Sequence, residues 1–183
     1  GIALVTGGSK GIGRALCLRF AQTGYQVFSA SRSTKQLSDT VSITQISVDL
    51  SDGTATQSFA REFIEQYGVP DILVNNAGYG AFFEWGECPE DEINRQIQVL
   101  FSSPVQLCRV FAPSMSKKGR GLILNLSSLA TLYPLPYMPL YNAGKSALSS
   151  FTESMLLEYP NYPKFIDFRM GDVRTDFNLS ANK

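Results

Sequence analysis

A tyrosine and a lysine stand four residues apart in the segment PLYNAGKSAL, which covers residues 139–148. The segment has the pattern of a helix start, and residues i and i+4 share one helix face, so the Lys145 side chain can approach the Tyr141 phenol. An unperturbed tyrosine titrates near about 10, and a nearby ammonium favours the phenolate form. A pKa lowered by about 2 would make Tyr141 a usable general acid or base near neutral pH.

The chain contains no histidine among its 183 residues, so its acid–base chemistry must come from other side chains. Ser-His-Asp and Cys-His nucleophilic sites are therefore excluded, and so are most zinc hydrolases. The three cysteines, at positions 17, 88 and 108, are widely spaced and form no CxxC pair, which argues against structural zinc and against a disulfide framework. We expect no metal site and three reduced thiols.

Basic and acidic residues balance, with 16 of each, and hydrophobic residues make up 44% of the chain. This composition is typical of a globular protein, and without a basic run we expect no nucleic-acid partner. No apolar run approaches the ~18–20 residues that a membrane span needs, and the start GIALVTGG lacks the features of a secretory signal. We expect a cytoplasmic protein without membrane contact, in which residues 1–183 form one domain.

Short apolar runs alternate with helical patterns along the chain. Strands without strict alternation, separated by helices, predict a parallel sheet buried on both faces, and right-handed crossovers make it a doubly wound, Rossmann-like α/β fold. Ligands in such a sheet bind beyond the carboxyl ends of the strands, so the segments after each strand hold the candidate site residues. The predicted strands are 2–5, 26–30, 43–47, 71–75, 122–126 and 165–169, and the predicted helices are 12–23, 54–67, 90–115 and 140–159.

The segment after the first strand, TGGSKGIG at residues 6–13, is rich in glycine and runs into a helical pattern. Glycine allows a tight turn and a close approach of the backbone to a ligand. The start of the following helix offers unpaired N–H groups and a positive dipole end, which suit a pyrophosphate. A glycine pattern between a buried strand and a helix favours a dinucleotide-binding loop, and an ordinary strand–helix turn is the alternative.

The TGxxxGxG spacing of this loop resembles the cofactor loop of the short-chain dehydrogenase/reductase family. Three further segments fit the same family in order: NNAG at 75–78, NLSS at 125–128 and YNAGK at 141–145. After the sixth strand, MGDVRT at 170–175 resembles the PGxVxT segment that meets the nicotinamide end of the cofactor. The resemblance covers nearly the whole chain and implies hydride transfer between a nicotinamide cofactor and a carbonyl or alcohol substrate.

The resemblance assigns catalytic roles to three residues. Ser128 lies 13 residues before Tyr141, which is the spacing usual in the family. In the reductive direction Tyr141 would protonate the carbonyl oxygen, and Ser128 would hydrogen-bond and orient that oxygen as charge develops on it. Lys145 would bias the Tyr141 phenol and hold the hydroxyl groups of the nicotinamide ribose.

The second strand ends in SASRS at residues 29–33, where NAD-preferring sites usually place an acidic residue for the ribose 2′-hydroxyl. This chain has Arg32 there and Lys10 in the glycine loop, and a guanidinium group suits a phosphate dianion. We therefore predict NADP(H), with a solvated surface arginine as the alternative interpretation of Arg32. The resemblance implies further cofactor contacts at Gly7, Ser9, Gly11, Ile12 and Gly13, at Asp49 and Leu50, at Asn76, Ala77 and Gly78, and at Gly171, Val173 and Thr175.

The chain departs from the family pattern at three places. Leu100 replaces a fourth catalytic residue, an asparagine whose backbone carbonyl holds a water that links the lysine to solvent. Pro104 has no N–H to bond the carbonyl at i−4, so we expect the Leu100 carbonyl to be free for that water, with a simple helix kink as the alternative. Met170 replaces a proline. The sequence stops at Lys183, before the usual substrate lid, last helix and last strand, so either the fold is trimmed or the sequence is partial.

Two apolar and aromatic segments flank the expected pocket, YGAFFEWG at 79–86 and LATLYPLPYMPL at 129–140. Such segments are typical of pockets for lipophilic carbonyl compounds, and dimer contacts or ordinary core are the alternatives. The family usually pairs subunits through its two long helices, so we expect a homodimer or homotetramer. A second hypothesis is a cofactor-binding regulatory or structural subunit with little catalysis. Leu100 and the early C-terminus favour that hypothesis, whereas the Ser-Tyr-Lys set favours an enzyme.

Overall fold

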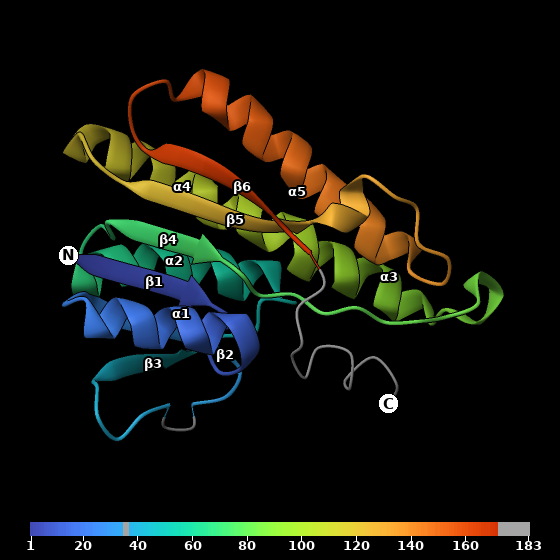
Figure 1. The fold of residues 1–183 in the computed structure, drawn as a ribbon, viewed down its shortest axis with the longest axis horizontal. Coiled ribbons are helices and arrows are strands. Elements are labelled where there is room, and N and C mark those ends of the chain that lie inside the picture. The colour runs from blue at the N-terminus through green and yellow to red at the C-terminus, as the bar shows by residue number, and fades with distance from the viewer. Residues whose placement is uncertain (35–36, 172–183) are drawn as a thin grey trace.

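The structure, a computed structural model, describes residues 1–34 and 37–171. Its centre is a six-stranded parallel sheet in the order β3-β2-β1-β4-β5-β6 (Figure 1). The strand order reverses between the neighbours β1 and β4, and in such a sheet the ligand crevice lies at this point. The strands are β1 Ile2–Thr6, β2 Gln26–Ser31, β3 Ile43–Ser47, β4 Ile72–Asn75, β5 Leu122–Ser128 and β6 Lys164–Met170.

Helices cover both faces of the sheet, as the doubly wound prediction requires. On one face α1 packs against β1, β2 and β4, and on the other α2, α4 and α5 share a core with the same sheet (Figure 1). No helix within the described residues is both long enough and apolar enough to cross a membrane. The helices are α1 Gly11–Gln22, α2 Gly53–Tyr67, α3 Glu90–Ile97, α4 Ser103–Lys118 and α5 Pro139–Glu158, with short 3-10 turns at Trp85–Glu87 and Leu129–Thr131.

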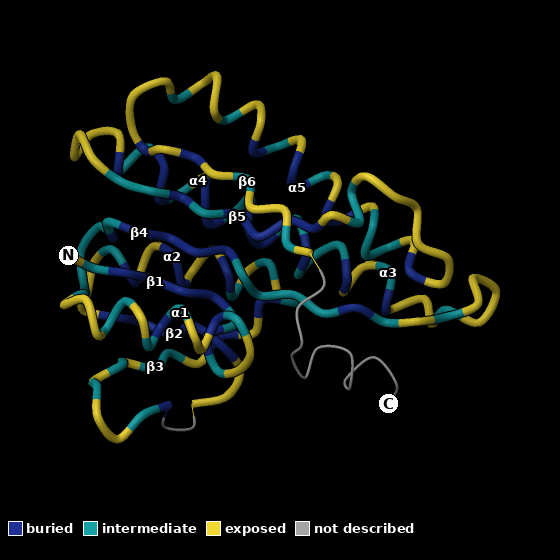
Figure 2. The backbone as a smooth tube through the Cα atoms, in the orientation of Figure 1, coloured by how far each residue is buried: buried dark blue, intermediate teal, exposed yellow. Residues whose placement is uncertain are grey.

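The core is densest around the central strands. Phe28 of β2, Phe63 of α2 and Phe111 of α4 are fully buried and meet edge to face, with ring centroids 5.0 and 5.9 Å apart. Figure 2 shows the contrast between the buried β1 and β4 and the more exposed β6. Ile166 and Phe168 of β6 are exposed on the face opposite α5, and β6 forms one edge of the sheet among the described residues.

Every predicted strand and helix is present, and the predicted ends differ from the observed ones by at most three residues. One prediction needs correction, because the single helix expected over 90–115 is divided. A π-helical turn at Gln98–Ser102 separates α3 from α4, and the Ser103 N–H donates to the Gln98 carbonyl, five residues back. Pro104 lies in the first turn of α4, where a missing N–H interrupts the regular ladder, so the irregularity has a cause in the sequence.

Candidate active site

The glycine loop after β1 packs backbone against backbone. Gly7 has a φ of +65°, and a Cβ on it would lie 2.8 Å from the Ala77 Cα. A Cβ on Gly13 would lie 2.3 Å from the Gly7 carbonyl oxygen, so neither position accepts a side chain. Helix α1 begins at Gly11, and among the described residues no side chain caps its first N–H groups. Those N–H groups are oriented for an anion beyond the strand ends.

Asn76 fixes the shape of this loop. Its Nδ2 donates to the carbonyl oxygens of Thr6, at 2.9 Å, and of Gly7, at 3.1 Å. The backbone N–H groups of Asn76 and Ala77 both donate to the Thr6 Oγ1, at 3.0 and 3.1 Å. The ends of β1 and β4 are thereby joined at the point where the sheet order reverses. The NNAG segment therefore does more than turn the chain, because its second asparagine holds the glycine loop.

One cavity of about 1510 Å³ runs along the carboxyl ends of the strands. Typical small-molecule pockets measure about 300–1,000 Å³, so this one has room for a dinucleotide together with a substrate. Gly13 was predicted to line the cofactor site, but it packs beneath the loop against Gly7 and not in the cavity wall. Val173 and Thr175 lie outside the described residues. The predicted residues that line the cavity are Gly7, Ser9, Lys10, Gly11, Ile12, Arg32, Asp49, Leu50, Asn76, Ala77, Gly78, Ser128, Tyr141, Lys145 and Gly171.

Two arginines that the sequence analysis missed, Arg14 and Arg95, line the same end of the cavity as Lys10 and Arg32. The Arg14 guanidinium donates to the Leu37 carbonyl at 2.8 Å. Arg95 of α3 lies 5.8 Å from the centre of the Tyr79 ring. The helical pattern did not show which face of α3 would border the cavity, so only the fold could reveal Arg95.

A single carboxylate, Asp49, faces these cations among the described lining residues. Hydrogen bonds from the Ser51 N–H and hydroxyl, at 2.9 and 2.8 Å, are the main cause that lowers the Asp49 pKa. Burial opposes this change, and the charges of Arg32 and Arg95 add to it. This end of the cavity therefore combines several cations with one ionised acid, which suits a ligand that carries multiple negative charges.

At the opposite end, Ser128 and Tyr141 lie together. Ser128 closes β5, and its Oγ accepts a hydrogen bond from the Ala130 N–H at 3.1 Å. Burial raises the pKa of Tyr141, and a side-chain hydrogen bond with Ser128 lowers it in part. Tyr141 is therefore a protonated phenol at neutral pH and can donate a proton to a carbonyl oxygen in the cavity.

Lys145 lies on the same helix face but points to β5. Its ammonium is almost fully buried and donates to the Leu126 carbonyl at 2.6 Å. Burial lowers the pKa of Lys145 to about 8, and the negative charge of Asp167 opposes this effect. The predicted lowering of the Tyr141 pKa by Lys145 is wrong for this structure, because burial dominates the phenol and the ammonium is held at the strand.

Leu100 fills the space beside Lys145. It lies in the π-helical turn, is fully buried and packs so closely that a Cβ on Gly144 would come within 2.8 Å of its own Cβ. A Cβ on Gly78 would lie 3.2 Å from the Leu100 Cδ2 and 3.5 Å from the Lys145 Nζ. The leucine side chain thus takes a position between two glycines. The role predicted for its backbone carbonyl stays a proposal.

The end of the cavity that holds Ser128 and Tyr141 is bordered by apolar and aromatic side chains. Tyr137 has a φ of +63°, which is unusual for a non-glycine residue, and its carbonyl accepts a hydrogen bond from the Phe83 N–H at 3.1 Å. This bond joins the two predicted flanking segments across the cavity mouth. The exposed side chains that line this end are Phe82, Leu129, Tyr133, Leu135 and Tyr137.

Comparison with known proteins agrees with this geometry. A family model described as short chain dehydrogenase matches residues 1–183. The chain belongs to the short-chain dehydrogenase family. A curated relative in this family, the 3-ketodihydrosphingosine reductase of Bacteroides thetaiotaomicron, is 30% identical over 182 residues, which is 99% of this chain and 67% of that protein. The chain spans only 62% of a second curated relative, which is 31% identical.

Solved structures of other dehydrogenases share the fold. The alcohol dehydrogenase from the archaeon Thermococcus sibiricus, complexed with 5-hydroxy-NADP, is 28% identical with a TM-score of 0.86, over 96% of this chain and 78% of that one. A 4-hydroxyisoleucine dehydrogenase complexed with NADH is 25% identical with a TM-score of 0.86, over 98% of this chain and 78% of that one. Of these two similar dehydrogenases, one is thus complexed with a modified NADP and the other with NADH.

Proposed function

We propose that this short-chain dehydrogenase is an NADP(H)-dependent oxidoreductase that transfers a hydride between the nicotinamide and a carbonyl or alcohol carbon. The observation that supports it most is the shared cavity, with an uncapped helix start at one end and the Ser128–Tyr141 pair at the other. The bound cofactor would supply the hydride. The protein would supply the binding site for it, the orientation of the substrate and the proton.

The residues fit such a cofactor. The glycine loop has no room for a Cβ at Gly7 or Gly13, so the backbone can approach a pyrophosphate closely. We propose that Asp49 and Leu50 flank the adenine, that the backbone from Asn76 to Gly78 lines the adenosine side, and that Lys10, Arg14, Arg32 and Arg95 attract the 2′-phosphate. The preference for NADP(H) rests on these charges.

The proton step follows from the burial of the catalytic residues. Tyr141 holds its proton at neutral pH and would donate it to the carbonyl oxygen as negative charge develops there. Ser128 would donate a hydrogen bond to the same oxygen. The Lys145 ammonium uses one of its three N–H donors on Leu126, which leaves two for ribose hydroxyls or a water at the Leu100 carbonyl.

Three finer features are part of the proposal. The apolar border of the catalytic end supports a lipophilic carbonyl or alcohol substrate. The exposed Leu156 and Leu157 on α5 support pairing of subunits through α4 and α5 into a homodimer or homotetramer. A location in the cytoplasm stays a prediction from the sequence.

One observation favours a second candidate function, a cofactor-binding regulatory or structural subunit. Leu100 places an apolar side chain beside Lys145, where the family pattern has an amide. A protein that bound the cofactor but had lost its proton path would keep the charged end of the cavity and lack turnover. The two candidates therefore differ in hydride transfer and not in cofactor binding.

The decisive experiment follows oxidation of NADPH and of NADH by the intact protein with a panel of aliphatic, aromatic and polar carbonyl compounds. We expect turnover with at least one apolar carbonyl compound and a preference for NADPH. The non-catalytic subunit would be supported if the protein bound NADPH tightly but oxidised it with none of these compounds. The same would hold if it bound NADP⁺ tightly but reduced it with none of the matching alcohols.

A further inference from the structure

A polar stripe runs along α5 from the cavity to the outer surface. Tyr141, Lys145, Ser149 and Glu153 follow one another at intervals of four residues, so they share one face of the helix. Their exposure changes along the stripe, because Lys145 and Ser149 are buried whereas the Glu153 side chain is 60% exposed. The catalytic function uses the first two residues and leaves the outer two without a role.

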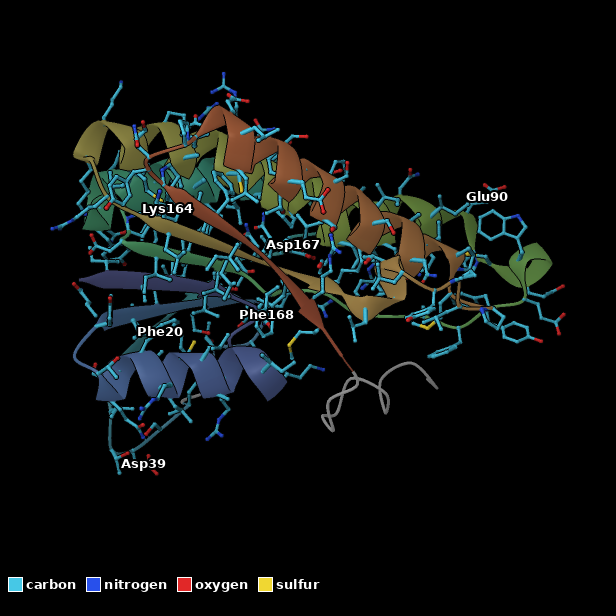
Figure 3. All side chains as sticks on the ribbon, turned by 45° about the horizontal axis from the view of Figure 1, so that its top comes forward. Phe20, Asp39, Glu90, Lys164, Asp167 and Phe168 are labelled. Atoms are coloured by element: carbon cyan, nitrogen blue, oxygen red, sulfur yellow. The ribbon has the colours of Figure 1, made fainter. Side chains whose placement is uncertain are left out.

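Strand β6 supplies two charged residues to the same stripe. The Asp167 Oδ2 accepts hydrogen bonds from the Ser149 Oγ, at 2.7 Å, and from the Arg169 Nε, at 2.8 Å. Arg169 also donates to Ser149 at 3.1 Å and pairs with Glu153. Figure 3 labels Asp167 on the side of β6 toward α5 and Phe168 on the other side, as strand geometry requires. The carboxylate is therefore fixed from two elements.

The second oxygen of this carboxylate is buried and unsatisfied. No described residue makes a hydrogen bond of normal geometry with the Asp167 Oδ1, and the same holds for the hydroxyl of Ser127 on β5. Ser127 still lies close enough to Asp167 to lower its pKa. The Ser127 hydroxyl is thus a donor of poor geometry for this buried, ionised carboxylate. Such an oxygen is costly unless a positive charge lies near it, and the cation on the same face of α5 is Lys145.

Among the described residues, Asp167 is the one charged group that acts on Lys145, and its negative charge raises the Lys145 pKa. From α5 Lys145 meets the neutral Tyr141, and from β5 the Leu126 carbonyl. From the π-helical turn the apolar side chain of Leu100 lies beside it. The other charged groups close to these elements pair elsewhere: Glu92 and Arg95 of α3 lie against Tyr79, and Arg169 lies beyond Asp167.

We propose that Asp167 is a positioning residue that keeps Lys145 in its ammonium form beneath the catalytic tyrosine, with Ser149 and Arg169 holding the carboxylate in place. Burial favours the neutral amine, and a neutral amine has one N–H donor fewer for the Leu126 carbonyl, the ribose and the relay water. The catalytic consequence rests on the proposed function, whereas the charge state of Lys145 does not.

A titration of Lys145 by NMR, with 13C-labelled lysine and with Lys145→Arg to assign the signal, tests the proposal in the cofactor-free protein. Wild-type Lys145 should titrate near about 8. Asp167→Asn keeps the shape and an acceptor for Ser149 but removes the charge, so the Lys145 pKa should fall by about 1, a tenfold change in the protonation equilibrium. An unchanged pKa in folded Asp167→Asn protein would overturn the proposal.

Arg169→Met is the matched control, because it removes the cation that partly neutralises Asp167 and leaves the carboxylate. The Lys145 pKa should then stay or rise, opposite to its response in Asp167→Asn. A fall of equal size in both variants would show general loosening of the β6 edge and contradict the proposal. Ser149→Ala, which removes one hydrogen bond but no charge, should lower the pKa less than Asp167→Asn.

Turnover provides an independent second measurement. Since the ammonium form is required, the high-pH limb of the kcat profile should move to lower pH in Asp167→Asn, with little change in the Kd for NADPH. A lowered Lys145 pKa with an unmoved kcat profile would refute the catalytic role of Asp167. Absence of turnover in the wild type would count against the proposed function alone, because the NMR titration would still decide the charge coupling.

Discussion

The two ends of the cavity handle charge in opposite ways. At the charged end Lys10, Arg14, Arg32 and Arg95 are all exposed, and they face Asp49, the single carboxylate among the described lining residues. At the Ser128–Tyr141 end the one cation among the described lining residues, Lys145, is 5% exposed and lies among hydroxyls and apolar side chains. Exposed charges are screened by salt and individually weak. The first end would therefore select a multiply charged anion through the number of its cations. Buried charges respond strongly to each neighbour, so the second end depends on single contacts.

The strongest test of this difference is Lys145→Met. The change should lower turnover by about 10²–10⁴-fold, since it removes the buried donor beside Tyr141. Folding stability should hold or rise, because the apolar side chain avoids the cost of a buried charge. The measurements are kcat and the free energy of unfolding, and a Lys145→Met protein that fails to fold would indicate a structural lysine.

The same variant gives a pH prediction with a definite sign. The folded Lys145 pKa is lowered from 10.5 to about 8, so the unfolded chain binds the proton more tightly than the folded one. Lys145 therefore adds to stability as the pH rises from about 8 to about 10.5, and below that window its charge costs stability. The stability of the wild type relative to Lys145→Met should increase across this range, and a decrease would contradict the burial of an ammonium.

The catalytic end should also resist added volume. Gly144→Ala would place a Cβ 2.8 Å from the Leu100 Cβ, which should cost about 1–3 kcal/mol of stability through overpacking. Leu100→Gly in the same chain should remove that clash, because glycine lacks the contacting Cβ. The two substitutions should therefore be less destabilising together than their sum. Urea unfolding of the single and double variants measures this coupling, and strict additivity would show that the two residues do not touch.

At the exposed end a single substitution should have a smaller effect. Arg32→Ala should weaken NADPH binding by about tenfold, or about 1.4 kcal/mol, and leave NADH binding nearly unchanged. Arg61→Ala, an exposed arginine on α2 outside the cavity lining, is the control. Titration of both cofactors decides the matter. Equal losses of affinity for NADPH and NADH would show that Arg32 does not bind the 2′-phosphate.

The smallest effects concern the proton path beside Lys145. If the Leu100 carbonyl carries the relay water, Leu100→Asn should change kcat by less than about tenfold. Pro104→Ala should cost more, because the restored N–H can bond that carbonyl and regularise the π-helical turn. Both variants are compared by kcat against pH after folding is verified. A contrary result would be a hundredfold higher kcat in Leu100→Asn together with an unaltered kcat in Pro104→Ala. It would show that the relay is broken in this protein because it lacks the asparagine amide.

The features that the sequence predicted correctly are those that depend on neighbouring residues. Apolar runs separated by helical patterns were sufficient for the sheet, and the glycine spacing placed the loop, because both follow from neighbouring residues. Pro104 signalled the irregular helix, although its exact form, a π-helical turn, depends on packing. The Tyr141 pKa was predicted in the wrong direction, since burial depends on residues distant in the chain. Arg95 and Asp167 were missed for the same reason, as only the fold brings α3 and β6 to the site.

The central claim is that Tyr141 donates the proton while the charged end of the cavity binds the cofactor independently. Tyr141→Phe keeps the ring and removes only the hydroxyl, so single-turnover hydride transfer from NADPH to an accepted carbonyl substrate tests it most directly. We expect a rate lower by about 10²–10⁴-fold with a Kd for NADPH within about twofold of the wild type. Hydride transfer at the wild-type rate in folded Tyr141→Phe protein would contradict it.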